Sequence, residues 1–351
     1  MTESITETLV PAAIPYPSSV RLGRIEDEPI DVYHRTPAIS NSKLADFAAP
    51  TGRPSLFYEK HVLGIREQQA ESPALFMGNV ADCLVLEGPE AMDRRYVINP
   101  RPHFGDMRIK VNKEAQAKWE LLNTPILEQF DASVKAGKIP VSQEDYAFAM
   151  RLREAVLRNK IARAVLACGK PQITWRIRMP HFLVQCRTDY FVESASAELA
   201  QYLPVNEGDA LFVDLKTTDS LDEEGYASFW KQVRQKRYYR QLALYREVIQ
   251  PILKRPIAFA CLIAVEKTPP YECGVYVPPE KDMQLGIEEI LWTLRNLQLC
   301  AQKGVWPGVP QDQVVPLPLK EWHHREVAGE MERASALFAT LQELPDRQLT
   351  P

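Results

Sequence analysis

The stretch FVDLKTT, residues Phe212 to Thr218, decides the fold because it places two charged residues at the end of a buried-looking strand. Together with Ala210 and Leu211 it forms a nearly continuous apolar run, which is typical of a central strand covered on both faces. Strand residues two apart point to the same face, so Asp214 and Lys216 should project together. The pair indicates either an ion pair, which is the common case, or a reactive site.

Length and composition favour a globular protein. The chain has 351 residues, of which 45% are hydrophobic and 25% charged, with a net charge of −4. No apolar run reaches about 18 residues, and no basic, apolar leader begins the chain, so we expect no membrane span, no signal peptide and a cytoplasmic location. The six cysteines include no Cys-x-x-Cys pair, which argues against a zinc or iron–sulfur site.

The pattern of apolar residues changes along the chain. Residues 1–37 should form an irregular arm, and residues 311–351 a Pro-rich segment followed by a helix. Between them we expect short helices over 39–47, capped by Ser40 or Ser42, and over 54–64, closed by Gly64. Further helices are predicted over the ranges 73–86, 113–132, 142–167, 223–250 and 280–303.

A period of two residues indicates the strands. The segments 173–177 and 182–187 flank a turn near Pro180 and should form a hairpin, whose second strand continues through 190–194. Further strands are predicted over the ranges 210–218, 257–267 and 271–278. The order of elements predicts an α/β or α+β fold with a mixed central sheet flanked by helices.

A second acid, Asp189, lies in CRTDYF on the strand that precedes FVDLKTT. If these strands pair, the carboxylates of Asp189 and Asp214 converge. Two carboxylates bind a hard cation such as Mg²⁺ or Mn²⁺, and Lys216 could orient or deprotonate a water, or stabilise charge on a phosphate. This combination indicates metal-assisted hydrolysis of a phosphodiester.

The helix after this strand mixes basic and aromatic residues in SFWKQVRQKRYYRQLALYREV, residues 228–248. Such a mixture suits a nucleic-acid backbone and unstacked bases, although a solvated basic face beside an aromatic core would have the same composition. Gln241 and Tyr245 are one helical turn apart and share a face. The candidate DNA-binding residues are Lys231, Arg234, Arg237 and Arg240.

With these residues in view, the sequence resembles a known family. CRTDYF, FVDLKTT and YYRQLALY resemble the core of the PD-(D/E)xK nuclease superfamily, in particular the RecE-like exonucleases of the exodeoxyribonuclease VIII type. ISNSKLADF with PSLFYEKHVLG, FMGNVADCLVLEGPE, AVEKTPPYECGVYVPPE and GVWPG are similar to further segments of that group. The resemblance covers residues 38–310, with a catalytic core at about 70–278, and implies a restriction-endonuclease-like α/β fold with helical N-terminal additions.

The resemblance also implies roles for single residues. Asp189 and Asp214 would be metal ligands, Lys216 the catalytic lysine, and Gln241 with Tyr245 a pair behind the site and near the DNA backbone.

Two positions depart from the family pattern. Asp82 stands where the family carries a histidine, and its carboxylate could ligate Mg²⁺ at least as well as an imidazole does. Gln172 stands where an acid is often found on the first hairpin strand, and its neutral amide oxygen would be a weaker and doubtful ligand.

The function that the resemblance implies is that of a Mg²⁺- or Mn²⁺-dependent DNA exonuclease of a phage or prophage recombination system. It would degrade one strand of linear duplex DNA from 5′ to 3′, leave a single strand for an annealing protein, and assemble as a ring-shaped homo-oligomer. The departures at Asp82 and Gln172 motivate an alternative, a catalytically impaired DNA-binding or regulatory protein. A second alternative, a repair or CRISPR-associated nuclease with an iron–sulfur cluster, is disfavoured by the cysteine spacing.

Overall fold

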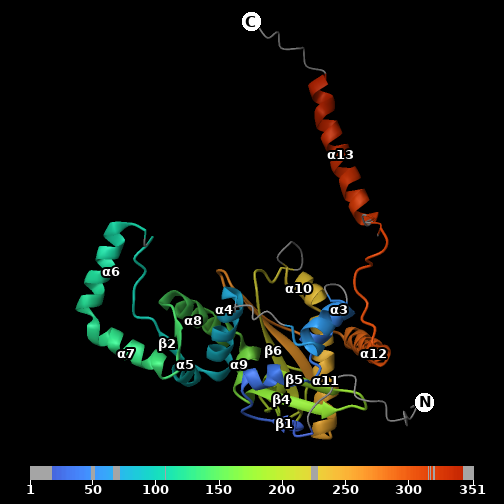
Figure 1. Cartoon of the computed structure of the whole chain (residues 1–351), viewed down its shortest axis with the longest axis horizontal. Helices are drawn as coiled ribbons and strands as arrows, with labels where there is room; N and C mark the ends of the chain where they lie inside the picture. The colour runs from blue at the N-terminus through green and yellow to red at the C-terminus, as the bar shows by residue number, and fades with distance from the viewer. Residues whose placement is uncertain are drawn as a thin grey trace. The chain divides into compact units, whose positions relative to one another are not determined.

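A six-stranded mixed sheet organises the larger part of the protein, as the computed structural model shows (Figure 1). The chain divides into two units, residues 1–307 and 308–351, and the second contains the helix α13 (Glu321–Gln342). No helix in the described part of the chain is long and apolar enough to cross a membrane. The structure describes residues 18–48, 52–65, 72–106, 108–222, 228–314, 316, 318 and 321–342.

The strands lie in the order β1-β4-β5-β6-β7-β8, which places the FVDLKTT strand inside the sheet. Within this sheet, β6 and β7 are the one parallel pair among the described strands, and α10 and α11 make the crossover between them, as parallel neighbours require. These findings confirm the prediction of an α/β fold with a mixed central sheet. The strands are β1 (Gly23–Ile25), β4 (Lys170–Arg178), β5 (Leu183–Val192), β6 (Leu211–Thr218), β7 (Phe259–Glu266) and β8 (Cys273–Tyr276).

The predicted hairpin is confirmed by antiparallel pairing of β4 with β5, closed by a 2.8 Å hydrogen bond from the Met179 amide to the Phe182 carbonyl. A separate two-stranded sheet joins β2 (Tyr96–Ile98) in parallel to β3 (Ile139–Val141), where no strand was predicted.

Most of the predicted helical ranges are helical, but the ranges 113–132 and 142–167 each contain two helices, which are separated at Asn123 and Asn159. The Ser40 side chain caps α2 by accepting from the Lys43 amide, and Gly304 ends α12 in the left-handed conformation, with φ of 64°. The helices are α1 (Ile30–Arg35), α2 (Asn41–Phe47), α3 (Pro54–Phe57), η1 (Tyr58–Val62), α4 (Pro73–Asp82), η2 (Cys83–Glu87), α5 (Pro89–Arg95), α6 (Lys110–Leu122), α7 (Thr124–Lys135), α8 (Gln143–Arg158), α9 (Lys160–Leu166), η3 (Leu199–Gln201), α10 (Phe229–Lys236), α11 (Tyr238–Leu253) and α12 (Glu280–Lys303).

The prediction of one helix over 223–250 is wrong. Residues 223–227 lie outside the described residues, and the remainder forms two helices, α10 and α11. The break is Arg237, whose φ of 53° and ψ of 49° are left-handed and cannot continue an α-helix. The break lets α11 change direction and pack against β4 and β5.

The prediction of an irregular arm over 1–37 is also wrong for its described part, because β1 pairs with β4 and α1 follows it. A buried ion pair fixes this segment: the Arg176 guanidinium donates from both terminal nitrogens to the Glu28 carboxylate at 3.0–3.1 Å. Arg176 also donates to Gln185 Oε1 at 2.9 Å, and the Gln185 amide donates to the Tyr33 carbonyl. The N-terminal segment is therefore part of the sheet.

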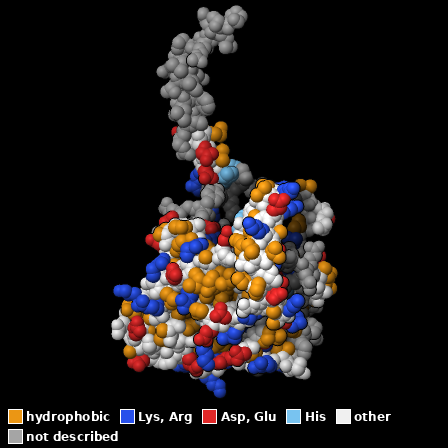
Figure 2. Space-filling model, turned by 90° about the vertical axis from the view of Figure 1, so that its left-hand side faces the viewer, with side chains coloured by type: hydrophobic (Ala, Val, Ile, Leu, Met, Phe, Trp, Pro, Cys, Tyr) orange, Lys and Arg blue, Asp and Glu red, His pale blue; other side chains and the backbone are white. Residues whose placement is uncertain are grey.

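Helices α6 and α7 lie to one side of the sheet (Figure 1). On the face that Figure 2 shows, viewed from that side, hydrophobic side chains gather in the middle and charges of both signs surround them.

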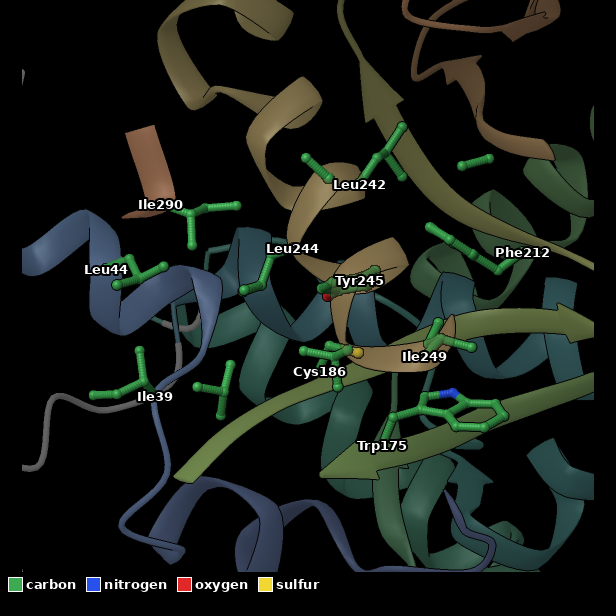
Figure 3. Packing of buried hydrophobic residues seen from close by; sticks show 14 of the residues in the cluster. Ile39, Leu44, Trp175, Cys186, Phe212, Leu242, Leu244, Tyr245, Ile249 and Ile290 are labelled. Carbon is green, nitrogen blue, oxygen red and sulfur yellow. The ribbon is translucent and has the colours of Figure 1, made fainter. Parts of the chain in front are cut away.

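Two apolar layers sandwich the sheet. Phe212 of β6 packs with α2, α3, α11 and α12, while its neighbours Leu211 and Val213 pack with η2, α8 and α9. Figure 3 shows the first layer, where Leu244, Tyr245 and other residues of α11 lie over Trp175 and Cys186 of the hairpin strands. Because successive residues of β6 alternate between the layers, Asp214 and Lys216 face α11.

Replacing Glu28 with alanine should lower the free energy of unfolding by about 3–5 kcal/mol, because it leaves the Arg176 guanidinium buried without its partner charge. Urea denaturation followed by circular dichroism measures the change. Asp31→Ala is the matched control, since it removes an exposed ion pair with Arg35 and should cost less than about 1 kcal/mol. Equal losses in the two variants would show that the buried pair does not hold the segment.

Candidate active site

The register of β5 and β6 brings two acids together. Tyr190 is aligned with Val213, and continuing this antiparallel register by one residue sets Asp189 opposite Asp214. The Asp189 carboxylate reaches across to β6, where its Oδ2 accepts a 2.8 Å hydrogen bond from the Leu215 amide. The convergence that the sequence predicted for these two carboxylates is therefore present.

Asp214 is the centre of the site and is only 1% exposed. Its Oδ1 accepts a 2.6 Å hydrogen bond from the Gln241 side-chain amide, which also donates to the Tyr245 hydroxyl at 3.0 Å. Its Oδ2 is buried without a hydrogen bond to the described residues but forms an ion pair with the Lys216 ammonium. The one-turn spacing of Gln241 and Tyr245 thus places both behind Asp214, as the resemblance implied.

Lys216 is enclosed by opposite charges and by an aromatic ring. Its ammonium nitrogen lies 4.8 Å from the centre of the Tyr238 ring, at the first turn of α11. Burial lowers the pKa of Lys216, but the carboxylates of Asp214 and Asp189 outweigh it, and the net pKa is raised above its ordinary value. At neutral pH Lys216 is therefore a cation that can neutralise or orient an anionic group.

Asp82 is the last residue of α4, where the helix widens into the π-helical turn η2. Burial raises the pKa of Asp82 to about 7; Lys216 opposes this effect and Asp214 adds to it. Burial, then Asp214 and Asp82, likewise raise the pKa of Asp189 well above its ordinary value. The structure therefore brings Asp82 into electrostatic contact with the predicted site, from an element more than a hundred residues earlier in the chain.

The donor set fits a hard divalent cation. The Asp214 carboxylate contributes to the raised pKa values of both Asp82 and Asp189, so the three acids form a region of excess negative charge, and oxygen ligands of this kind suit Mg²⁺ or Mn²⁺. Asp214 Oδ2 pairs with the Lys216 ammonium in this structure and has no other partner among the described residues. Among the described residues, no three His, Cys, Asp or Glu side chains already stand in a metal-ligating arrangement. The positive charge next to the acids in this structure comes from the Lys216 ammonium, which pairs with Asp214.

Gln172 does not match the doubtful ligand role that the sequence gave it. Its backbone is left-handed, with φ of 56°, and its Oε1 accepts a 2.8 Å hydrogen bond from Arg187. Arg187 also donates to the Glu28 carbonyl at 2.6 Å. Because the amide oxygen is engaged by a cation, Gln172 supports Arg187 rather than the acid cluster.

The prediction that Arg240 binds DNA is wrong, because the side chain is only 2% exposed. Its Nε donates to Asn41 Oδ1 at 3.1 Å, and its guanidinium lies 3.9 Å from the Glu289 carboxylate. Arg237 is half-buried and forms a 2.7 Å ion pair with the same carboxylate. Arg240 therefore connects α11 to α2 and α12, and Arg237 connects the start of α11 to α12.

The remaining predicted DNA-binding residues, Lys231 and Arg234, lie on α10 together with Lys236. Arg234 is exposed, as is Lys236, while Lys231 is half-buried. The sequence pattern could not separate these residues from Arg237 and Arg240, because all five were assigned to one uninterrupted helix.

A cavity of about 1200 Å³ adjoins the acid cluster. Asp82 and Asp189 line it together with Gln241 and Tyr245, and cations line it as well. The sequence analysis missed Arg187, although CRTDYF places it two residues before Asp189 on the same strand. The cations that line the cavity are Arg94, Arg95, Lys170 and Arg187.

A family model agrees with this fold. The model of a family described as "PDDEXK-like domain of unknown function (DUF3799)" matches residues 40–311. The crystal structure of a candidate exonuclease from Eubacterium rectale has a TM-score of 0.47 and 16% identity, over 81% of this chain and 91% of that chain. A second solved structure has a TM-score of 0.22 and 12% identity, over 48% of this chain and 68% of its own. No curated protein matches.

Replacing Asp82 with asparagine should raise the melting temperature of the metal-free protein at about pH 8 by several degrees. The raised pKa means that the folded state binds a proton more tightly than the unfolded state, so the free energy of unfolding falls as pH rises from about 4 to about 7. Asparagine does not ionise, so the variant should not show this fall in the free energy of unfolding. Differential scanning fluorimetry in a chelator, between about pH 4 and pH 8, measures it.

Asp93→Asn, at an exposed position on α5, is the matched control and should leave the pH dependence unchanged. Adding Mg²⁺ should raise the melting temperature of the wild type more than that of Asp82→Asn. If the Asp82→Asn protein melts below the wild type in chelator at about pH 8, the Asp82 carboxylate does not destabilise the metal-free protein.

Proposed function

We propose that this chain, which belongs to the family of PDDEXK-like domains of unknown function (DUF3799), is a divalent-metal-dependent nuclease that hydrolyses phosphodiester bonds of linear duplex DNA. The observation that carries the proposal is the gathering of Asp82, Asp189 and Asp214 around the Lys216 ammonium. An ion pair that served stability alone would need neither the second and third carboxylates nor the cavity beside them.

Each residue has a separate task in this mechanism. Asp82, Asp189 and Asp214 would hold Mg²⁺ or Mn²⁺, which when bound activates water and withdraws charge from the scissile phosphate. Gln241 donates to Asp214 Oδ1 and so fixes the orientation of that carboxylate. Lys216, which pairs with Asp214 in this structure, would orient the attacking water and stabilise charge on the phosphate oxygens.

The finer parts of the proposal rest on the order of the motifs. The segments that resemble RecE-like exonucleases span residues 38–310 and support an exonuclease acting from 5′ to 3′ on DNA ends, within a recombination system of phage or prophage type. The same resemblance supports an annealing protein as partner and a ring-shaped homo-oligomer. Exposed Arg234 and Lys236 on α10 supply the local positive charge that contact with the DNA backbone requires.

One contact favours a second candidate, a DNA-binding or regulatory protein without catalysis. Gln172, where the resembled family often has an acid, is hydrogen-bonded to Arg187 and offers no negative charge to a metal. Incubating linear duplex DNA with the protein and Mg²⁺ or Mn²⁺ separates the candidates: release of nucleotides supports the nuclease, and binding without release supports the second candidate.

Lys216→Ala should reduce cleavage at least about 100-fold while changing DNA affinity by less than about threefold, because it removes charge stabilisation at the scissile phosphate rather than a binding surface. Cleavage of end-labelled duplex and fluorescence anisotropy measure the two quantities. Lys267→Ala is the matched control, since that lysine pairs with Asp219 at the surface. A Lys216→Ala enzyme that cuts at the wild-type rate would remove the lysine from the mechanism.

Replacing Arg234 and Lys236 together with alanine should weaken DNA binding and flatten its dependence on salt. For every phosphate that the variant no longer neutralises, the slope of log K against log salt concentration should fall by about 0.9. Anisotropy titrations at several salt concentrations measure the slope. Arg35→Ala, which removes an exposed cation from α1, is the control; an unchanged slope in the α10 variant would mean that α10 does not bind the DNA backbone.

A further inference from the structure

Arg187, in the wall of the cavity beside the acids, is held in place by uncharged groups only. It is half-buried on β5. Its Nε donates to Gln172 Oε1 at 2.8 Å, and its Nη1 donates to the backbone carbonyl of Glu28 at 2.6 Å. No ion pair joins this guanidinium to an acid in the described part of the chain, and its Nη2 donates to no described residue. The positive charge of Arg187 is therefore fixed in position but not neutralised.

The other cations that line the cavity differ from Arg187, because all of them are exposed. Two of them are also paired with acids: Arg95 with Glu87, and Lys170 with Glu26 at 3.1 Å. Exposed Arg94 has no ion pair with any residue that the structure describes. Arg187 is thus the half-buried member of the set, and it has no counter-charge of its own.

Most of the acids that line the cavity outside the acid cluster are already engaged. Glu28 is held by Arg176 at 3.0 Å, and Glu26 and Glu87 have the partners just given. Asp27, the remaining acid of this lining, is exposed. An anion that enters this part of the cavity therefore meets an unneutralised guanidinium, while the buried carboxylate nearest to it is paired with another arginine.

A purely structural role for Arg187 does not account for the neutral amide at position 172. A guanidinium is held more strongly by a carboxylate than by an amide, so glutamate there would attach Arg187 and the N-terminal segment more firmly. Leaving a half-buried charge without a counter-ion is costly. Gln172 orients the guanidinium without neutralising it, which is the arrangement that an anionic ligand requires.

The position of Arg187 on β5 indicates which anion it would meet. Arg187 precedes Asp189 by two residues, and both line the cavity. Two residues of a β-strand span about 6–7 Å, a length comparable with one nucleotide step along a DNA strand. A phosphate bound at Arg187 would therefore be the neighbour of the phosphate at the acid cluster, rather than that phosphate itself.

We propose that Arg187, oriented by Gln172, binds a phosphate group of the DNA strand next to the phosphate at the acid cluster. The guanidinium donates to the phosphate oxygens through its Nη2, and exposed Arg94 in the same lining adds positive charge. This inference rests on the proposed nuclease function, which supplies the DNA. The group bound is a phosphate in either of two positions, the terminal phosphate of a 5′ end or the next phosphate within the strand.

Gln172→Glu tests the proposal, because it places a carboxylate against Arg187 and neutralises its charge while the guanidinium stays in position. Affinity for duplex DNA ends should fall on the order of tenfold. The slope of log K against log salt concentration should fall by about 0.9, which corresponds to the loss of one phosphate contact. Arg187→Gln, which removes the charge altogether, should give the same losses. Fluorescence anisotropy in a chelator measures both quantities and needs no cleavage.

Two duplexes distinguish the two positions of the phosphate, one with a 5′-phosphate and one with a 5′-hydroxyl at its ends. If Arg187 binds the terminal phosphate, the wild type should prefer the phosphorylated duplex and Gln172→Glu should lose that preference. If it binds the next phosphate within the strand, Gln172→Glu should weaken binding of both duplexes equally. Either result supports the phosphate site.

The controls separate the loss of a phosphate contact from loss of fold and from failure of the nuclease proposal. Gln284→Glu adds the same charge at an exposed glutamine of α12 and should bind DNA like the wild type. Gln172→Glu should melt no lower than the wild type, because it gains an ion pair with Arg187. If the wild type cleaves no DNA but the losses of affinity persist, the nuclease proposal fails and the phosphate site stands. Wild-type affinity and slope for both duplexes in Gln172→Glu and Arg187→Gln would overturn the phosphate site alone.

Discussion

The convergence of Asp189 and Asp214 just beyond the paired part of β5 and β6 is the constraint on which the site depends. The pairing ends at Tyr190 and Val213, so the next residue on each strand is an acid, and Asp214 is 1% exposed. Burial and the neighbouring Asp214 carboxylate raise the pKa of Asp189, and the Lys216 ammonium opposes this effect. The Lys216 ammonium pairs with Asp214 in this structure, and Asp82 completes the cluster from α4. The sheet therefore gathers more negative charge at this site than the single positive charge of Lys216 neutralises.

The N-terminal segment contacts both the interior of the sheet and a residue that lines the cavity beside the acids. Glu28 neutralises Arg176 in the interior, and its backbone carbonyl accepts from Arg187, which lines the cavity beside the acids. Arg187 in turn holds Gln172 on β4. A segment that has the composition of a linker thus fixes the position of a cation near the site. Its removal would disturb the cavity as well as the stability of the sheet.

Much of this arrangement could be predicted from the sequence, because it depends on residues that lie two or four positions apart and therefore share one face of a strand or helix. A two-residue period placed Asp214 and Lys216 on one face, and a four-residue period placed Gln241 with Tyr245. Contacts between distant segments could not be predicted in this way. Burial of Arg240 depends on Asn41 in another helix and Glu289 in a third. The break at Arg237 is a left-handed residue in a sequence with high helix propensity, so tertiary packing overrides local preference there.

Asp82 changes the charge of the site relative to the family that the motifs resemble, where this position is a histidine. With all groups ionised, Asp82, Asp189, Asp214 and Lys216 carry a net charge of −2, which one Mg²⁺ ion neutralises completely. A neutral imidazole would leave −1 and less mutual repulsion among the acids. In the proposed nuclease the carboxylate would strengthen the attraction for a divalent cation, at the cost of a less stable metal-free protein at neutral pH. The same physical cause, uncompensated negative charge at the end of β6, accounts for both effects.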